Sequence, residues 1–163
     1  MKTLLIMRHA KSSWKDADEA DHDRPLNKRG QRDAPRMGAV LRQHDLTPEL
    51  MLCSTALRAR ATAAAVAEAC GFDGEIRLTP SFYAAGPDAY VNVLHTLDDD
   101  YERVMVVGHN PGLEELVELL TGEAETMPTC AVAHVRLPLD RWRALRVGIE
   151  GELVAVWRPR ESG

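Results

Sequence analysis

The sequence is short of cysteine and of long apolar runs, and both shortages restrict its class. Three cysteines stand far apart in the 163 residues, with no CxxC pair among them. An odd, scattered set does not suggest a disulfide framework, so we expect reduced thiols and a cytoplasmic protein. No apolar stretch approaches the roughly 18 residues of a membrane-spanning helix, which predicts no membrane partner. The few apolar residues that precede Arg8 are too short a run for a secretory signal.

Basic residues are outnumbered as well, because 20 Lys and Arg residues face 25 Asp and Glu residues. The net charge is −5 and the pI is near 5.7. Nucleic-acid-binding proteins usually carry a basic face, so we predict no nucleic-acid partner. The sequence also has no Walker-type glycine-rich loop and no carboxylate pair with metal-ligand spacing, so we predict no metal and no other cofactor. The negative net charge still allows a small cationic pocket inside an acidic protein.

Short apolar runs are present throughout the chain, and they predict buried strands. The expected strands lie at residues 3–7, 50–53, 75–78, 104–107, 130–137, 142–149 and 153–157. Segments with helical apolar spacing follow each of the first four, whereas no helix is expected among the last three, which favours antiparallel pairing there. We therefore predict an α/β fold, a three-layer α/β/α sandwich whose mostly parallel central sheet has an antiparallel edge. Without a linker or repeat, residues 1–163 are expected to form a single domain.

Basic and imidazole side chains follow three of these strands directly. Arg8 and His9 end the first strand, Arg58 comes shortly after the second, and His109 follows the strand at residues 104–107. Ligands bind at the carboxyl ends of strands in open α/β sheets, so these side chains are expected to meet. Each one alone has an ordinary interpretation as a surface charge or a structural histidine. Together they predict a phosphoryl-binding pocket, because arginine donates paired N–H groups to phosphate oxygens.

The segments around these residues predict local structure. Ser54 or Thr55 is expected to cap the helix that carries Arg58, and Pro111 is expected at the first position of the helix after His109. Residues 11–29 form a long polar loop that is either functional or a solvated excursion. In this loop Trp14 is expected either to wall the pocket or to pack. Lys11 and Lys15 are expected either to add positive potential near the pocket or to balance the acidic loop. His22 is expected to be exposed to solvent.

Three motifs in this order resemble those of the histidine phosphatase superfamily, which has the phosphoglycerate mutase-like fold. Residues 7–10 (Met-Arg-His-Ala) resemble its Arg-His-Gly motif, residues 54–62 its second-arginine motif and residues 107–111 its second-histidine motif. Residues 24–30 and 82–84, together with the short chain, look like the SixA-type phosphohistidine phosphatases. The resemblance implies that the chain is a hydrolase acting on phosphoric monoesters or phosphoramidates.

The resemblance also implies the role of each site residue. His9 would be the nucleophile that forms a phosphohistidine intermediate, while Arg8, Arg58 and His109 would bind the phosphoryl oxygens and stabilise the transition state. Ala10 replaces the usual glycine, with little effect expected. The general acid stays open, because the chain lacks the insertion that supplies one in many members. Its candidates are Asp18, Asp21, Asp23 and Asp88.

The substrate is expected to be a phosphorylated protein, or a small phosphorylated molecule, bound by a monomer. Protein phosphohistidine is favoured, because its leaving group departs readily once the ring is protonated, whereas an alkoxide needs a stronger acid. Three alternatives stay open from the sequence. The first is a small-molecule phosphoester phosphatase, the second a phosphomutase with the same covalent step, and the third a phospho-ligand binding module without turnover.

Overall fold

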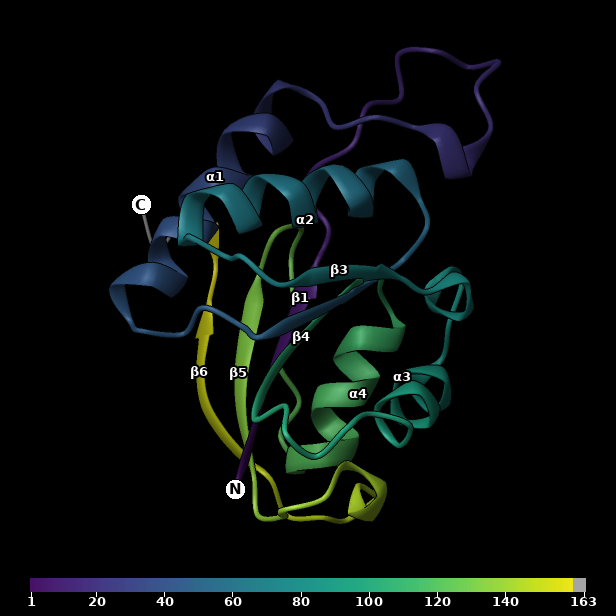
Figure 1. Cartoon of the computed structure of the whole chain (residues 1–163). Coiled ribbons are helices and arrows are strands. Elements are labelled where there is room, and N and C mark those ends of the chain that lie inside the picture. Colours follow the sequence, from purple (N-terminus) through teal and green to yellow (C-terminus); the bar gives the residue numbers. More distant parts are fainter. Residues whose placement is uncertain (160–163) are drawn as a thin grey trace.

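The computed structural model of the chain describes residues 1–159 and has one six-stranded sheet (Figure 1). The strand order is β3-β2-β4-β1-β5-β6, in which the first four strands run parallel and the last two pair antiparallel. The strands are β1 (Lys2–Arg8), β2 (Leu50–Cys53), β3 (Glu75–Leu78), β4 (Arg103–Gly108), β5 (Val132–Leu137) and β6 (Glu152–Trp157). This sheet confirms the predicted parallel centre and antiparallel edge.

Helices cover both faces of the sheet (Figure 1). They are α1 (Lys28–Gln43) and α2 (Leu57–Cys70) on one face, and α3 (Pro87–Leu94) and α4 (Gly112–Thr121) on the other. Side chains alternate along β1, so that Leu4 and Ile6 join the core beneath α3 and α4 while Leu5 and Met7 join the core beneath α1 and α2. All four side chains are fully buried, which explains why β1 reads as a continuous apolar run. Within residues 1–159 no helix has the length and apolar character needed to cross a membrane.

The predicted strand at residues 142–149 is wrong. Its start is a short 3-10 helix, η3 (Trp142–Ala144), and no strand forms in this range. The reason is the fully buried indole of Trp142, whose Nε1–H donates to the carbonyl oxygen of Tyr101 at 2.8 Å. Its backbone N–H donates to Asp99 Oδ1 at 2.9 Å. The segment closes the end of the core instead of extending the sheet.

Two helix starts also differ from the predictions. Ala56 is the N-terminal cap of α2 without a side-chain bond, so neither Ser54 nor Thr55 caps this helix. The helix α4 starts at Gly112 with Pro111 as the capping residue, one position later than expected. In the first case the hydroxyl group of Ser54 has another partner, which lies in the site described below.

The polar loop between β1 and α1 is closed at its base and carries a short 3-10 helix, η1 (Asp21–Asp23). The backbone N–H of Asn27 donates to the carbonyl oxygen of Lys11 at 3.0 Å, and Ser12 bridges to Leu26. Gly30 of α1 lies against this base, since a Cβ atom there would be 2.2 Å from the Lys11 carbonyl oxygen. We name residues 11–27 the 11–27 loop. Because its ends are joined, it is an Ω-type loop that stands at the carboxyl edge of the sheet.

Candidate active site

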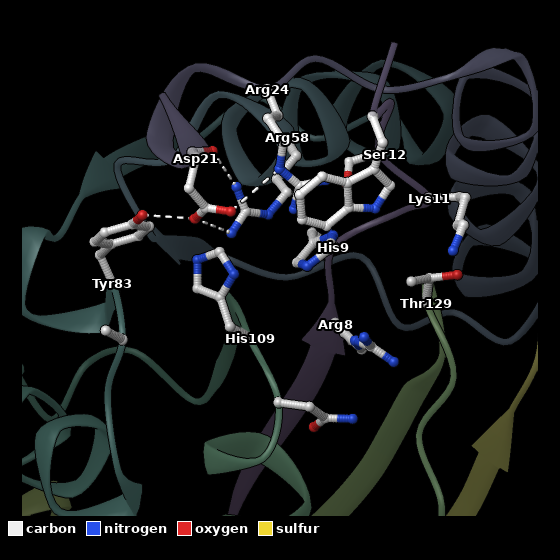
Figure 2. A pocket seen from close by; sticks show the side chains of 13 residues that line it. Arg8, His9, Lys11, Ser12, Asp21, Arg24, Arg58, Tyr83, His109 and Thr129 are labelled. Atoms are coloured by element: carbon white, nitrogen blue, oxygen red, sulfur yellow. Dashed lines mark hydrogen bonds and ion pairs between the residues drawn. The ribbon is translucent and has the colours of Figure 1, made fainter. Parts of the chain in front are cut away.

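The four predicted site residues meet in one cavity of about 520 Å³ at the carboxyl edge of the sheet (Figure 2). Arg8 is the last residue of β1, and Arg8 pairs with Gly108 of β4, so His9 and His109 follow neighbouring strand positions. Their ring centroids are 5.1 Å apart. Arg58 enters from the first turn of α2. The register of two adjacent parallel strands therefore brings the two histidines together.

His9 is held as a neutral ring with one nitrogen occupied. Its side chain is buried, and its Nδ1 lies 2.7 Å from the carbonyl oxygen of Ala10, which can only accept a proton. Burial lowers the pKa of His9 to about 3, with smaller contributions from His109, Arg58 and Arg8. Because a carbonyl oxygen only accepts hydrogen bonds, Nδ1–H of His9 is the donor in this contact and Nε2 keeps a free lone pair.

His109 is oriented by Ser54, a contact that sequence reasoning missed. The Ser54 Oγ lies 2.8 Å from His109 Nε2 and also accepts the backbone N–H of Ala56 at 3.3 Å. Because a hydroxyl group can donate to this nitrogen or accept from it, the contact fixes the orientation of the His109 ring in either tautomer. Burial lowers the pKa of His109 to about 4, and Arg58 adds to this effect. The only signal for this contact in the sequence is a serine directly after β2, a position that also suits a helix cap.

Arg58 is fixed by Asp21 of η1, which Figure 2 shows between Arg58 and Tyr83. The Nη1 of Arg58 donates to the backbone carbonyl oxygen of Asp21 at 2.7 Å, and its Nη2 donates to Asp21 Oδ2 at 3.0 Å. The same carboxylate accepts the Tyr83 hydroxyl at 2.6 Å and the Nε–H of Arg24 at 3.1 Å. The bond from Tyr83, followed by those from Arg58, lowers the pKa of Asp21 to about 2. Asp21 is consequently a carboxylate at neutral pH.

This result narrows the four candidates for the general acid. Of these, Asp21 lines the cavity, whereas the other three are exposed and lie outside its lining. The three are Asp18, Asp23 and Asp88. Within residues 1–159, Asp21 is the single carboxyl group among the lining residues and is ionised, so this part of the chain offers the cavity no carboxylic acid at neutral pH.

The charge of the cavity is opposite to that of the whole chain. Four cationic side chains and one carboxylate line it, in a chain of net charge −5. The cations are Arg8, Lys11, Arg24 and Arg58. The Nε atoms of Arg8 and Arg58 are buried and have no hydrogen-bond partner within residues 1–159. Buried donors without a protein partner beside a cationic cavity suit an anionic ligand.

Two residues of the 11–27 loop, Trp14 and His22, lie beside the cavity or its lining residues. Trp14 lines the cavity although 72% of its surface is exposed, so it forms part of the cavity wall. His22 is half-buried, in contrast to the predicted exposure, because its Nε2 lies 2.9 Å from Thr55 Oγ1 and its ring packs edge-on against Tyr83. In residues 1–159 no group of three or more His, Cys, Asp or Glu side chains is arranged to hold a metal ion.

Comparisons with known proteins show what the chain is similar to. The family profile described as Histidine phosphatase superfamily (branch 1) matches residues 4–83. An uncharacterized protein of Mycobacterium leprae is 34% identical, with 94% of this chain and 100% of the relative covered.

Two solved structures named SixA have the same fold. One, from Agrobacterium tumefaciens, has a TM-score of 0.84 at 27% identity and covers 97% of this chain and 98% of its own. The other, from Nakamurella multipartitia, has a TM-score of 0.84 at 28% identity and covers 97% and 96%. The chain therefore belongs to the histidine phosphatase superfamily, and its fold is similar to that of these two SixA structures.

Proposed function

We propose that the protein is a metal-independent phosphatase that uses His9 as its nucleophile and removes phosphate from protein phosphohistidine. The observation that carries this proposal is the state of His9, a neutral ring whose Nδ1–H is held by the Ala10 carbonyl oxygen. A nucleophilic imidazole needs a free lone pair on its other nitrogen and a fixed orientation. The SixA structures that share this fold carry phosphohistidine phosphatase in their names, which supports the choice of substrate class.

The reaction has two steps that share one binding site. In the first, His9 Nε2 attacks phosphorus, a new P–N bond forms, and the P–N bond of the substrate breaks. The leaving nitrogen keeps the electron pair of that bond, and the substrate imidazole departs as a neutral ring because its other nitrogen already carries a proton. In the second, water attacks the phosphorus of the intermediate, the P–Nε2 bond breaks, and inorganic phosphate leaves the neutral His9 behind. Protein groups that stabilise one transition state therefore also stabilise the other.

Arg8, Arg58 and His109 are proposed to hold the three peripheral phosphoryl oxygens. Asp21 accepts from one N–H of Arg58 Nη1 and from one N–H of Nη2. A second N–H on each atom is left, and these are proposed to donate to the phosphoryl oxygens. We assign the Ser54 hydroxyl as the donor to His109 Nε2, and in this tautomer Nδ1–H of His109 is a further donor to the phosphoryl group. Donors that are fixed before the reaction stabilise transition-state charge without reorganisation, and one such donor accounts for about 10²–10³ in rate.

The ionised state of Asp21 favours a phosphoramidate over an alkyl phosphate. An alkoxide leaving group needs a proton from a nearby acid, and the cavity lining formed by residues 1–159 has no protonated carboxyl group at neutral pH. The imidazole of a phosphohistidine has a second ring nitrogen that takes a proton near neutral pH by itself. Its departure therefore depends less on an acid from the enzyme.

The test compares the purified protein with His9→Ala on three substrates: a phosphohistidine protein, an aryl phosphate and a sugar phosphate. We expect phosphate release from the first, with the sugar phosphate slowest, and retention of activity in excess chelator. Acid-labile, base-stable radiolabel should appear on the protein and be absent from His9→Ala. His44→Ala is the matched control, because His44 is an exposed histidine that stacks on Trp157 away from the cavity.

Each part of the proposal has its own refuting result. Turnover of His9→Ala at the wild-type rate would exclude His9 as the nucleophile. Equal or faster turnover of the sugar phosphate would refute the substrate class and leave the nucleophile standing. Binding of the phosphoprotein without phosphate release or labelled intermediate would identify a binding module instead.

A further inference from the structure

Trp14 is the most exposed aromatic side chain described above, and the proposed chemistry does not use it. Its exposed fraction is 72%, whereas Trp142 is fully buried in the core. A tryptophan left in water forgoes the large stabilisation that its apolar surface would gain from burial. Tryptophan is also enriched among the residues that dominate the energy of protein interfaces. An exposed indole at the rim of a functional cavity is therefore a candidate contact for a partner.

The indole is held in place although it is exposed. The guanidinium carbon of Arg24 lies 3.4 Å from the centroid of the Trp14 ring, a cation–π contact. Arg24 itself is buried and donates to Ser12 Oγ at 2.8 Å and to Asp21 Oδ1 at 3.1 Å. A ring that is already ordered loses little conformational entropy when a partner contacts it.

The ring also has a fixed position relative to the phosphoryl site. Arg24 contacts both Trp14 and Asp21, and Asp21 holds Arg58 through Nη2 at 3.0 Å. One guanidinium thus links the exposed ring to the arginine proposed to clamp the phosphoryl group. A surface that packs on Trp14 is therefore connected to Arg58 through two side chains, Arg24 and Asp21.

The surroundings of Trp14 resemble the rim of a protein interface. The residues that follow it in the 11–27 loop are charged and of both signs, namely Lys15, Asp16, Asp18 and Glu19. An aromatic centre with a polar, charged border is the usual composition of a small interface. Because His9 is almost completely buried, a phosphohistidine on a protein reaches it only when the surrounding protein surface approaches this rim.

We propose that Trp14 is a substrate-recognition residue whose open ring surface packs against the polypeptide next to the phosphohistidine of a protein substrate. The inference rests on the proposed function and deepens it, because it separates recognition of the protein from transfer of the phosphoryl group. Arg24 is the positioning residue that keeps the ring in its binding orientation. Small P–N substrates that have no surface beyond the phosphoryl group gain nothing from this contact.

The experiment compares two substrates that share the P–N bond and differ in size. One is phosphoramidate, and the other is a small protein phosphorylated on histidine by phosphoramidate and purified. For Trp14→Ala we expect KM for the phosphoprotein to rise by about tenfold or more, with kcat changed far less. The ratio of kcat/KM for phosphoprotein over phosphoramidate should fall by the same factor. Trp14→Phe keeps a ring over Arg24 and should retain most of that ratio.

Two controls separate recognition from support of the loop. Val147→Ala removes an equally exposed apolar side chain (70% exposed) that does not line the cavity, and the substrate ratio should equal that of the wild type. Inhibition by inorganic phosphate reports on Arg58 directly. In Trp14→Ala the inhibition constant should stay within about threefold of the wild type, since the change is at an exposed site.

The outcomes distinguish this inference from the proposed function. Equal losses on both substrates together with weaker phosphate inhibition would show that Trp14 only supports the loop, and would overturn the inference. An unchanged ratio in Trp14→Ala would overturn it as well, while turnover of the phosphoprotein by the wild type would still support the proposed function. Hydrolysis of phosphoramidate without any turnover of the phosphoprotein would refute both.

Discussion

Replacing Asp21 by asparagine tests the electrostatic role of this carboxylate, because it removes the charge and keeps the shape. In the wild type the carboxylate accepts from Arg58 Nη2 at 3.0 Å, from Arg24 Nε at 3.1 Å and from the Tyr83 hydroxyl at 2.6 Å. The backbone carbonyl of Asp21 still accepts from Arg58 Nη1 in the variant, so the 11–27 loop keeps one anchor. The expected result is a moderate loss of stability that depends on pH.

The size of the loss follows from the pKa of Asp21, which these contacts lower to about 2. A shift of this size from the usual value corresponds to roughly 2 kcal/mol before screening. Because the side chain is 49% exposed, water screens the interaction, and we expect about 1 kcal/mol. A lowered pKa means that this stabilisation is complete above the ordinary pKa of a carboxyl group and is lost as pH falls from about 4 toward 2.

Urea unfolding of the wild type and Asp21→Asn at pH 7, 5, 4 and 3 measures this difference in free energy. The gap should be largest at pH 7 and 5 and should shrink as the wild-type carboxyl group is protonated. Asp18→Asn is the matched control, because Asp18 is an exposed carboxylate of the same loop outside the cavity lining. A gap that is constant with pH, or equal in the two variants, would refute the assignment of Asp21 as an ionised anchor.

Three further predictions concern the histidines and the strand β4, which ends just before His109. The acid limb of kcat/KM should lie below pH 5, because the pKa of His9 is about 3 and that of His109 about 4, so both stay neutral until the pH falls toward those values; a limb near pH 6.5 would contradict this. Ser54→Ala should lower kcat/KM by about tenfold in steady-state assays, since His109 loses the bond that fixes the orientation of its ring. Gly108→Ala should lower the free energy of unfolding by about 2 kcal/mol or more, because the new Cβ would lie 2.2 Å from the Tyr90 hydroxyl oxygen. Tyr90→Phe removes that oxygen and should restore part of the loss in the double variant, as thermal unfolding would show.

Strands and their ends could be predicted from sequence because they depend on local composition. The apolar runs at residues 3–7, 50–53 and 104–107 became β1, β2 and β4. A parallel sheet with covered faces buries both sides of each strand, so its strands read as uninterrupted apolar runs. Polar residues directly after such runs lie at the carboxyl edge of the sheet, which is why His9 and His109 were found together.

Contacts between distant segments could not be predicted in the same way. Asp21 and Tyr83 are 62 positions apart, and Ser54 and His109 are 55 apart. The 11–27 loop has no apolar period that would fix its path, so nothing in the sequence ranked Asp21 above Asp18, Asp23 or Asp88 as a cavity residue. The wrong strand at residues 142–149 has a related cause. The residues around Trp142 suggest a strand, whereas its hydrogen bonds to residues 99 and 101, about 40 positions away, hold it in the core.

The position of Asp21 connects the geometry of this loop to the choice of substrate. A carboxyl group that anchors Arg58 must be ionised, whereas a general acid must be protonated, and one group cannot do both at the same pH. With a pKa of about 2, roughly one Asp21 in 10⁵ carries a proton at pH 7, so a route through it would start from a very rare state. The bonds that order the clamp therefore remove the acid from the cavity. A leaving group that takes its proton from water needs no acid from the enzyme. An imidazole is such a group, because it takes up a proton near neutral pH.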